Sequence, residues 1–318
     1  MTLSRRAFVK TLFAATAHTA LTGPLLTRGL FASGAREEGL NFLLVGDWGR
    51  NGQKDQRDVA RQMGVAAAQI SAPFIVSVGD NFYDYGVSSD EDPQFRTSFE
   101  EVYSDPSLQV PWRVILGNHD YRGNCQAQIA YSRKSGRWQM PARYYARTEG
   151  IPGGSAVDLI FIDTNPFIAQ YAHDTLMQRE IATQDSGKQL VWIEQRLAAS
   201  SAPWKLVIGH HPIYSGGEHG DSPELIEKLF PLLKRHGVQA YINGHDHDLQ
   251  HLQAGSLHMF CTGAGSTVRP TRMTAQSTFA TSRPGFMALS LRDQVLEARL
   301  IAGSGEVLYS CSVPRTAS

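Results

Sequence analysis

An aspartate and a tyrosine follow one apolar stretch of the sequence at a spacing that suits metal binding. Residues 74–78 are typical of a buried strand, and Asp80 comes soon after them, where a strand would pass into a loop. The carboxyl edge of an α/β sheet is where such folds place their ligands. A carboxylate has two oxygens, and the phenol of Tyr83 can reach the same point. We therefore predict that Asp80 bridges two metal ions.

Four further strand ends carry side chains of the same kind. Each residue alone has a simpler explanation, because an aspartate or asparagine after a strand is commonly a turn former and a single histidine usually has a structural role. Several strand ends with this chemistry in one chain are much harder to explain as turns. The predicted metal ligands are Asp47, Asp80, Tyr83, Asn118, His210, His245 and His247.

The types of donor in this set indicate which metals would bind. Carboxylates, an amide oxygen and imidazoles suit divalent zinc, manganese or iron(II). A phenolate is a hard anion and favours a trivalent ion, and no cysteine lies in these motifs, which disfavours a thiolate zinc site. We therefore predict Fe(III) plus a divalent ion, Fe(II), Zn or Mn. Two ions about 3.5–4 Å apart can clamp a phosphoryl group during in-line displacement.

Strands that alternate with helices must position these side chains. The helix predicted over 53–70 places Val59, Met63, Ala67 and Ile70 on one face, and a second helix is predicted over 93–103. The pattern predicts an α/β fold in which two packed β-sheets, a β-sandwich, are flanked by helices. The predicted strands cover 41–45, 74–78, 110–116, 157–163, 205–208, 238–242, 257–261, 286–291, 295–301 and 307–311.

Other segments have weaker patterns. Residues 121–148 are predicted to be loose, with one short helix over 127–134, and 166–185 could form a mobile loop over the site. Ser222 is predicted to cap a helix that has Pro223 at its first position and ends at Gly237. The glycine-rich residues 262–266 are expected to turn back toward the site.

The composition is that of a globular protein without a strong overall field. The chain has 318 residues, 42% hydrophobic and 19% charged, with a formal net charge of zero. No global charge therefore favours a nucleic-acid partner, and none is expected. One disulfide is possible, but the spacing of Cys125, Cys261 and Cys311 does not select a pair.

The N-terminal residues resemble an export signal. Arg5, Arg6 and Phe8 open a moderately apolar stretch, which small residues around 32–35 follow. We predict a twin-arginine signal over residues 1–35, recognised by the twin-arginine export machinery, and a single catalytic domain over 36–318. An ordinary secretory signal or a membrane anchor is the alternative. The expected location is periplasmic or secreted, and no later segment is apolar enough to span a bilayer.

Five short motifs resemble the metal motifs of the purple acid phosphatases, which belong to the metallophosphoesterase (calcineurin-like) superfamily. The small, tartrate-resistant type is the most similar, and the likeness extends over about 41–266. Tyr83 separates this family from relatives that have a histidine at the position of Gly49. The motifs are Asp47-x-Gly49, Gly79-Asp80-x-x-Tyr83, Gly117-Asn118-His119-Asp120, Val207-x-x-His210 and Gly244-His245-x-His247.

The resemblance implies a role for each residue. Asp47, Tyr83 and His247 would bind iron(III), whereas Asn118, His210 and His245 would bind the divalent ion, with Asp80 between them. His119 and His219 match the histidines of the family that contact substrate, and either could protonate the leaving group. His211 stands where many relatives have an aromatic residue, and for it and for Asp246 we expect an orienting or packing role.

The implied activity is that of an acid phosphatase, a phosphomonoesterase. Metal-bound hydroxide would attack the phosphorus of a phosphorylated small molecule in line with the leaving group. Two alternatives remain open at this point. The same site could serve a phosphodiesterase or pyrophosphatase, because the pocket loops set the substrate range, or the chain could be an iron-dependent redox or phosphate-binding protein.

Overall fold

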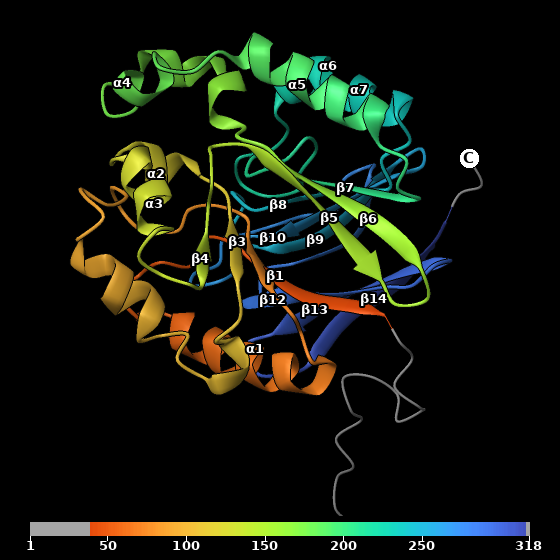
Figure 1. The fold of residues 1–318 in the computed structure, drawn as a ribbon, viewed down its shortest axis with the longest axis horizontal. Coiled ribbons are helices and arrows are strands. Elements are labelled where there is room, and N and C mark those ends of the chain that lie inside the picture. Colours follow the sequence, from red (N-terminus) through yellow and green to blue (C-terminus); the bar gives the residue numbers. More distant parts are fainter. Residues whose placement is uncertain (1–38, 316–318) are drawn as a thin grey trace, which may run out of the picture.

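Two β-sheets of seven strands each pack against one another in the computed structural model, which describes residues 39–315 (Figure 1). This arrangement confirms the predicted pair of sheets flanked by helices. The predicted export signal over 1–35 lies outside the described residues. None of the helices within 39–315 is both long and apolar enough to cross a bilayer.

The first sheet begins with the predicted parallel strands. β1, β2, β3 and β4 run parallel, whereas β12, β13 and β14 continue the sheet in antiparallel order beside β1. Because parallel strands share a direction, β1, β2 and β3 end at the same edge. From edge to edge the strands are β14 (Val307–Pro314), β13 (Val295–Ala302), β12 (Gly285–Leu291), β1 (Leu40–Val45), β2 (Ile75–Ser77), β3 (Trp112–Val114) and β4 (Trp138–Gln139).

The second sheet also has a parallel centre. β6, β7, β8 and β10 run parallel, and the antiparallel strands β5, β9 and β11 complete the sheet. From edge to edge the strands are β11 (Ser277–Thr281), β9 (Leu249–Ala254), β10 (Leu257–Thr262), β8 (Ala240–Asn243), β7 (Trp204–Ile208), β6 (Ser155–Phe161) and β5 (Tyr145–Ile151).

Successive side chains of a strand point to opposite faces of its sheet, and in β1 apolar side chains lie on both faces. In β1, Phe42 and Leu44 belong to the core between the two sheets, whereas Leu43 and Val45 pack on the helix-covered side. Strands buried on both faces appear in sequence as continuous apolar runs, as this one does. Each such side chain contributes about 1.5–3 kcal/mol through burial.

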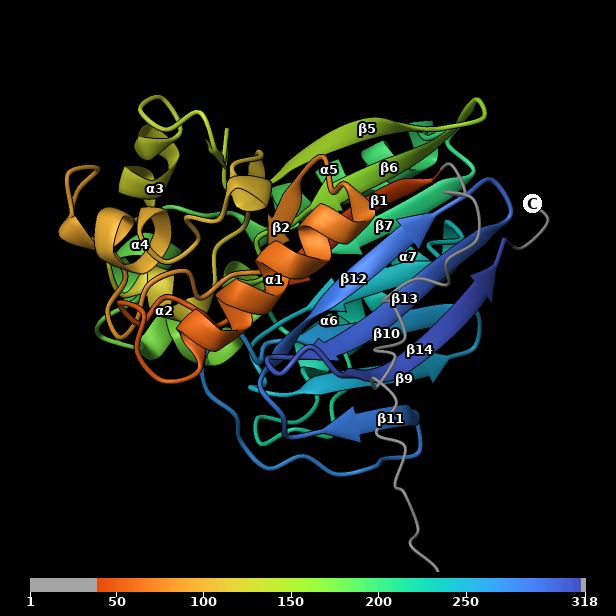
Figure 2. The same cartoon turned by 90° about the horizontal axis from the view of Figure 1, so that it is seen from below.

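Helices cover the two outer faces. α1 (Gln56–Ile70) packs against β1 and β12 on one side, with Val59, Met63, Ala67 and Ile70 buried as predicted. α5, α6 and α7 lie over the second sheet on the opposite side (Figures 1 and 2). The other helices and their bounds are α2 (Asn118–Tyr121), α3 (Cys125–Tyr131), α4 (Gln178–Ile181), α5 (Ser186–Ala199), α6 (Pro223–Lys228) and α7 (Phe230–Arg235).

Two predicted helices differ in the structure. The single helix predicted from Ser222 to Gly237 is two helices, because Pro231 has no N–H to donate and its ring blocks a continuous helix across Leu229. The helix predicted over 93–103 is the π-helix η1 (Phe95–Glu100), where the Glu101 N–H donates to the Arg96 carbonyl at 2.9 Å. The short helix predicted over 127–134 is α3, which begins two residues earlier.

The segments with weak patterns are ordered into short elements. Residues 121–148 include β4 and the start of β5, neither of which was predicted. Residues 166–185 include the 3-10 turns η3 (Asn165–Phe167) and η4 (Ala169–His173) as well as α4, and Tyr171 and Met177 of this segment are buried. Another 3-10 turn, η2 (Pro106–Leu108), precedes β3. All three cysteines are free.

Candidate metal centre

The structure brings all seven predicted ligands to the edge where the parallel strands of both sheets end. A backbone hydrogen bond joins the two sheets at this edge: the Gly46 N–H donates to the Thr262 carbonyl at 2.9 Å. The Thr262 hydroxyl also donates to the Leu44 carbonyl at 3.2 Å. The loops after β1, β2 and β3 therefore face those after β7 and β8.

Four side chains from these loops form a first cluster around the Tyr83 hydroxyl. This oxygen lies 3.1 Å from Asp47 Oδ1, 3.0 Å from Asp80 Oδ2 and 3.0 Å from His247 Nε2. Donor atoms of Asp47, Asp80 and His247 lie within 4.8 Å of one another, which is close enough to share one ion. All four residues are buried.

A second cluster gathers around the side-chain oxygen of Asn118. Asn118 Oδ1 lies 2.9 Å from His245 Nδ1 and 3.2 Å from His210 Nε2. His210 Nε2 in turn lies 3.5 Å from Asp80 Oδ1. Asp80 thus directs Oδ2 toward the first cluster and Oδ1 toward the second, which is the geometry that a bridging carboxylate requires.

Second contacts of two histidines fix which ring nitrogen is available. His210 Nδ1 lies 2.9 Å from the Val78 carbonyl of the opposite sheet. A carbonyl only accepts, so Nδ1 carries the proton and Nε2 keeps its lone pair for the centre. His247 Nδ1 lies 2.7 Å from the Thr267 hydroxyl, which can donate or accept, and this contact turns Nε2 toward Tyr83.

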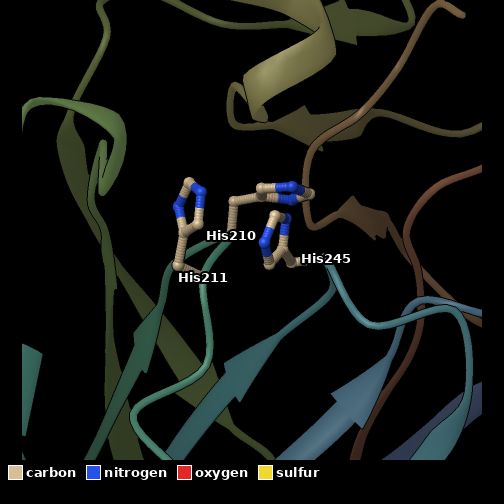
Figure 3. Close-up of side chains that lie close together, drawn as sticks. All are labelled: His210, His211 and His245. Atoms are coloured by element: carbon tan, nitrogen blue, oxygen red, sulfur yellow. The ribbon is translucent and has the colours of Figure 1, made fainter. Parts of the chain in front are cut away.

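His211 lies beside His210 and His245 but differs from them in its contacts. Figure 3 shows the three rings projecting from the ends of neighbouring strands, and their nitrogens lie within 4.8 Å of one another. Both ring nitrogens of His211 are engaged, however, Nδ1 with Thr164 Oγ1 at 2.7 Å and Nε2 with Tyr171 OH at 2.9 Å. These contacts support the orienting role expected for His211.

Three of the candidate ligands have an unusual backbone conformation. Asp47, Asp80 and His245 have φ values of 60°, 51° and 70°, in the left-handed region that non-glycine residues rarely adopt. Each costs about 1–2 kcal/mol, so the surrounding structure must impose it. Gly117 makes room for the loop that carries Asp80, because a Cβ at position 117 would lie 2.2 Å from Asp80 Oδ1.

The protein alone favours the protonated forms of two members of the first cluster, Asp47 and Tyr83. Burial, and then the charge of Asp80, raise the pKa of Asp47 well above its usual range. Burial and the charges of Asp47 and Asp80 also raise the pKa of Tyr83, so a phenolate forms there only beside a strongly charged cation. Burial and nearby Arg269 lower the pKa of His247 to about 3, which keeps its imidazole neutral.

Asp80 and the second cluster are already in the form that binds metal. Burial raises the pKa of Asp80, but the adjacent imidazoles of His210 and His119 and the hydrogen bond from the His119 main-chain N–H outweigh burial, so the pKa lies below its ordinary value. Burial lowers the pKa of His210 and His245, so both rings are neutral. An ionised carboxylate, an amide oxygen and neutral imidazoles that converge on one point fit a divalent ion.

His119 and His219 flank the two clusters on different sides. The His119 N–H donates to Asp80 Oδ1 at 2.8 Å, and its ring lies 4.3 Å from the ring of Tyr83. The ring of His219 stacks on that of His245 at 4.1 Å. The structure thus places both predicted catalytic histidines next to candidate ligands without making either a member of the clusters.

Two buried aspartates support the loops, and only for Asp246 was an orienting or packing role predicted. Asp120 is fully buried and accepts hydrogen bonds from the Gly117 N–H at 2.8 Å and the Asn81 N–H at 3.1 Å, which ties the loop after β2 to the loop after β3. Burial and the charge of Asp80 raise the pKa of Asp120 to about 7. Asp246 similarly accepts from the His219 N–H at 2.9 Å. Their place in the motifs was the only signal in the sequence.

Comparisons with known proteins agree with this site. The calcineurin-like phosphoesterase family model matches residues 40–249. Purple acid phosphatase 7 of Arabidopsis thaliana is 36% identical, over 87% of this chain and 86% of that protein. Tartrate-resistant acid phosphatase type 5 of Sus scrofa is also 36% identical, over 87% of this chain and 88% of its own length.

A solved structure extends the comparison to three dimensions. GAP50, the anchor in the inner membrane complex of Plasmodium, superimposes with a TM-score of 0.79 at 27% identity, over 88% of this chain and 90% of that one. The resemblance stated from the motifs is therefore confirmed by sequence and by fold. The chain belongs to the calcineurin-like phosphoesterases and, within them, to the purple acid phosphatase family of binuclear-metal phosphoesterases.

Proposed function

We propose that this chain is an acid phosphatase that hydrolyses phosphate monoesters at a pair of metal ions, one trivalent and one divalent. In this proposal Asp47, Tyr83 and His247 hold Fe(III), and Asn118, His210 and His245 hold Fe(II), Zn or Mn. The observation that carries the proposal is the position of Asp80, whose two carboxylate oxygens face different clusters. The phenol of Tyr83 at the centre of the first cluster supports a trivalent ion on that side.

The chain's own residues account for binding and proton transfer. When bound, two metal ions would polarise the phosphoryl oxygens and supply an activated water for in-line attack. His119 Nδ1 lies 2.7 Å from the Asp84 carbonyl and must carry a proton, so Nε2 is the nitrogen left for proton transfer. We assign to His119 the transfer of a proton to the leaving oxygen as its bond to phosphorus breaks.

His219 is less suited to that transfer. Its Nε2 lies 2.7 Å from Arg269 Nη1, and because the guanidinium only donates, this nitrogen must accept. Desolvation lowers the pKa of His219, and Arg269 lowers it further against the opposing charge of Asp246. We therefore assign His219 a contact with the phosphoryl group as a neutral imidazole.

One set of measurements tests the function and the metal assignment together. We expect purified protein to hold two metal ions, to hydrolyse para-nitrophenyl phosphate, and to turn over bis(para-nitrophenyl) phosphate much more slowly. A purple absorption band that disappears in Tyr83→Phe would support tyrosinate on Fe(III). Faster turnover of the diester would favour the phosphodiesterase alternative. The absence of turnover in metal-loaded protein would favour a binding role.

We further propose that the chain is exported in folded form by a twin-arginine pathway. The support is the sequence around Arg5, Arg6 and Phe8, and such a route suits a protein that acquires metal before export. In a bacterial host, replacing both arginines by lysine should retain the enzyme in the cytoplasm. Unchanged export of that double variant would contradict the proposal.

A further inference from the structure

Arginines from three loops surround the centre, and they differ in how fully their charge is neutralised. Arg50 follows β1, Arg122 ends α2, and Arg269 follows β10. Each contacts a residue of the centre or one of its flanking histidines. Because phosphate esters are anions and arginine is the side chain that best matches a carboxylate or phosphate, the contacts of each guanidinium are informative.

Arg269 belongs to the side of His219 and is already engaged. Its Nη1 donates to His219 Nε2 at 2.7 Å, and its Nε lies 3.7 Å from a carboxylate oxygen of Glu218. One of its hydrogen bonds thus serves to hold a histidine. The Glu218 side chain is 60% exposed, so water screens its pairing with Arg269.

Arg122 belongs to the side of His119 and has no comparable partner. Its Nη1 lies 3.2 Å from His119 Nδ1, but that nitrogen already directs its proton to the Asp84 carbonyl at 2.7 Å. Two donors cannot form a hydrogen bond with each other, so this contact satisfies neither. Arg122 Nε is buried without a hydrogen-bond partner, and within residues 39–315 no acidic side chain forms an ion pair with Arg122.

Arg50 adds positive charge to the same side. Its guanidinium carbon lies 3.8 Å from the centre of the Tyr83 ring, and its Nη1 lies 3.5 Å from Asp84 Oδ1. The Asp84 side chain is 65% exposed, so water screens this pair strongly. The Tyr83 and His119 side of the centre thus carries one unpaired guanidinium and a second that is weakly paired.

We propose that Arg122, with Arg50 beside it, binds an anionic group on the leaving group of the substrate. The inference rests on the proposed function, because it is the assignment of proton transfer to His119 that puts the leaving group on this side. In the step, a bond from water oxygen to phosphorus forms, the bond to the leaving oxygen breaks, and that oxygen takes a proton from His119. The attacking water releases one proton to solvent, and His119 regains a proton from solvent before the next turnover. Preferred substrates are phosphate esters whose leaving group carries a carboxylate or phosphate near the scissile bond.

The test compares two substrates that differ in one anionic group. 3-Phosphoglycerate and glycerol 3-phosphate have similar alcohol leaving groups, but only the first carries a carboxylate. We expect a higher kcat/KM for 3-phosphoglycerate in the wild-type holoenzyme, and we expect Arg122→Gln to lower the ratio of the two values by about 10–100-fold. Arg235→Gln on the exposed face of α7 is the matched control and should leave the ratio unchanged.

The possible outcomes separate this inference from the proposed function. Equal ratios in wild type and Arg122→Gln, with glycerol 3-phosphate still hydrolysed, overturn the role of Arg122 and leave the phosphatase proposal intact. Failure of the metal-loaded wild type to hydrolyse any monoester overturns both. If Arg122→Gln does not fold, Arg122→Lys serves in its place, because lysine keeps the charge but lacks the planar guanidinium. Arg122→Lys should lower the ratio of the two kcat/KM values by less than Arg122→Gln would, and an unchanged ratio overturns the inference.

A second pair of substrates identifies the anion that Arg122 binds. Adenosine diphosphate releases an anionic phosphate ester when its terminal phosphate is removed, whereas adenosine monophosphate releases a neutral nucleoside. A larger effect of Arg122→Gln on the diphosphate pair indicates a phosphate in this position, and a larger effect on the glycerate pair indicates a carboxylate. No effect on either pair overturns the inference.

Discussion

The two sheets supply different kinds of donor to the centre. The loops of the first sheet contribute only oxygens, from Asp47, Asp80, Tyr83 and Asn118, whereas the loops of the second sheet contribute only imidazole nitrogens. Each cluster needs members from both sheets. Neither sheet could therefore bind a metal pair alone, and the centre depends on how the two sheet edges are aligned.

The two sides are also held in position by different means. On the oxygen side, the carboxylates of Asp47 and Asp80 accept hydrogen bonds from main-chain N–H groups. On the nitrogen side, His210 and His247 are oriented through the ring nitrogen that faces away from the centre. Charge is thus concentrated on the first sheet, and orientation of neutral rings is the task of the second.

The largest effect is expected from removing Asp80, the one residue that both clusters share. We expect Asp80→Ala to lose both metal ions and to lower hydrolysis of para-nitrophenyl phosphate by about 10⁴-fold or more. Asp80→Asn is the matched control, because asparagine tolerates left-handed backbone and separates loss of charge from backbone strain. Metal analysis of Asp80→Ala that still finds two ions would contradict the bridging role.

A second variant pair asks which side delivers the proton. We expect His119→Ala, next to the oxygen donors, to keep both metals and to slow hydrolysis of an alkyl phosphate by about 10²–10⁴-fold. His219→Ala, next to the imidazoles, should have a smaller effect on kcat. If kcat falls more in His219→Ala than in His119→Ala, the assignment of the two histidines is reversed.

The orientation of the rings can be tested where the partner is a side chain. His210 is held by a main-chain carbonyl, but His247 is held by the Thr267 hydroxyl, which Thr267→Val removes at nearly constant volume. We expect the affinity for the ion in the first cluster to fall by about 10–100-fold, as is usual when the outer partner of a metal-bound histidine is lost. Competition with a chelator measures this, and equal affinities would show that packing alone orients the ring.

A histidine of the second sheet outside the centre gives a prediction for stability rather than for metal binding or catalysis. In β9, His251 bonds to Tyr309 through Nδ1 and to His258 through Nε2, both at 2.9 Å, so neither nitrogen is free for a metal. Burial, and then His258, lower the pKa of His251 to about 4. Between pH 6.5 and 4 the unfolded chain therefore binds more protons at this residue, and stability falls as the pH falls.

Urea unfolding at pH 7.5 and 4.5 measures that contribution. The loss of stability on acidification should be smaller in His251→Phe than in the wild type by about 3 kcal/mol, because phenylalanine can keep the stacking on Phe260 but has no proton to bind. An equal loss in both proteins would place the acid sensitivity elsewhere.

The sequence predicted the parts of the site that depend on position along a strand. Asp47, Asp80, Asn118, His210 and His245 each follow an apolar run, and parallel strands bring their carboxyl ends together, so convergence could be expected before any contact was known. The contacts that hold these side chains in place could not be predicted from the sequence. The Val78 carbonyl is 132 residues from His210, and only the packing of one sheet on the other brings these groups together.

The errors in the fold have local causes. β5 is an edge strand in which residues 146–148 are exposed, so it lacks the apolar pattern that marked the central strands. The break between α6 and α7 was a local signal that was present in Pro231 and was overlooked. Arg122 lacked any signal, because its lack of a partner is a property of the folded surroundings rather than of its neighbours in sequence.

The left-handed residues bear on how related sequences should be compared. Aspartate and histidine are among the few residue types that tolerate this conformation, so the backbone at Asp47, Asp80 and His245 favours the same residue types as a metal does. A descendant that had stopped binding metal could retain all three for the sake of its loops. Tyr83 and His247 do not have this backbone conformation, so nothing in the backbone favours keeping them. Their replacement would be expected earlier in a lineage that had lost catalysis.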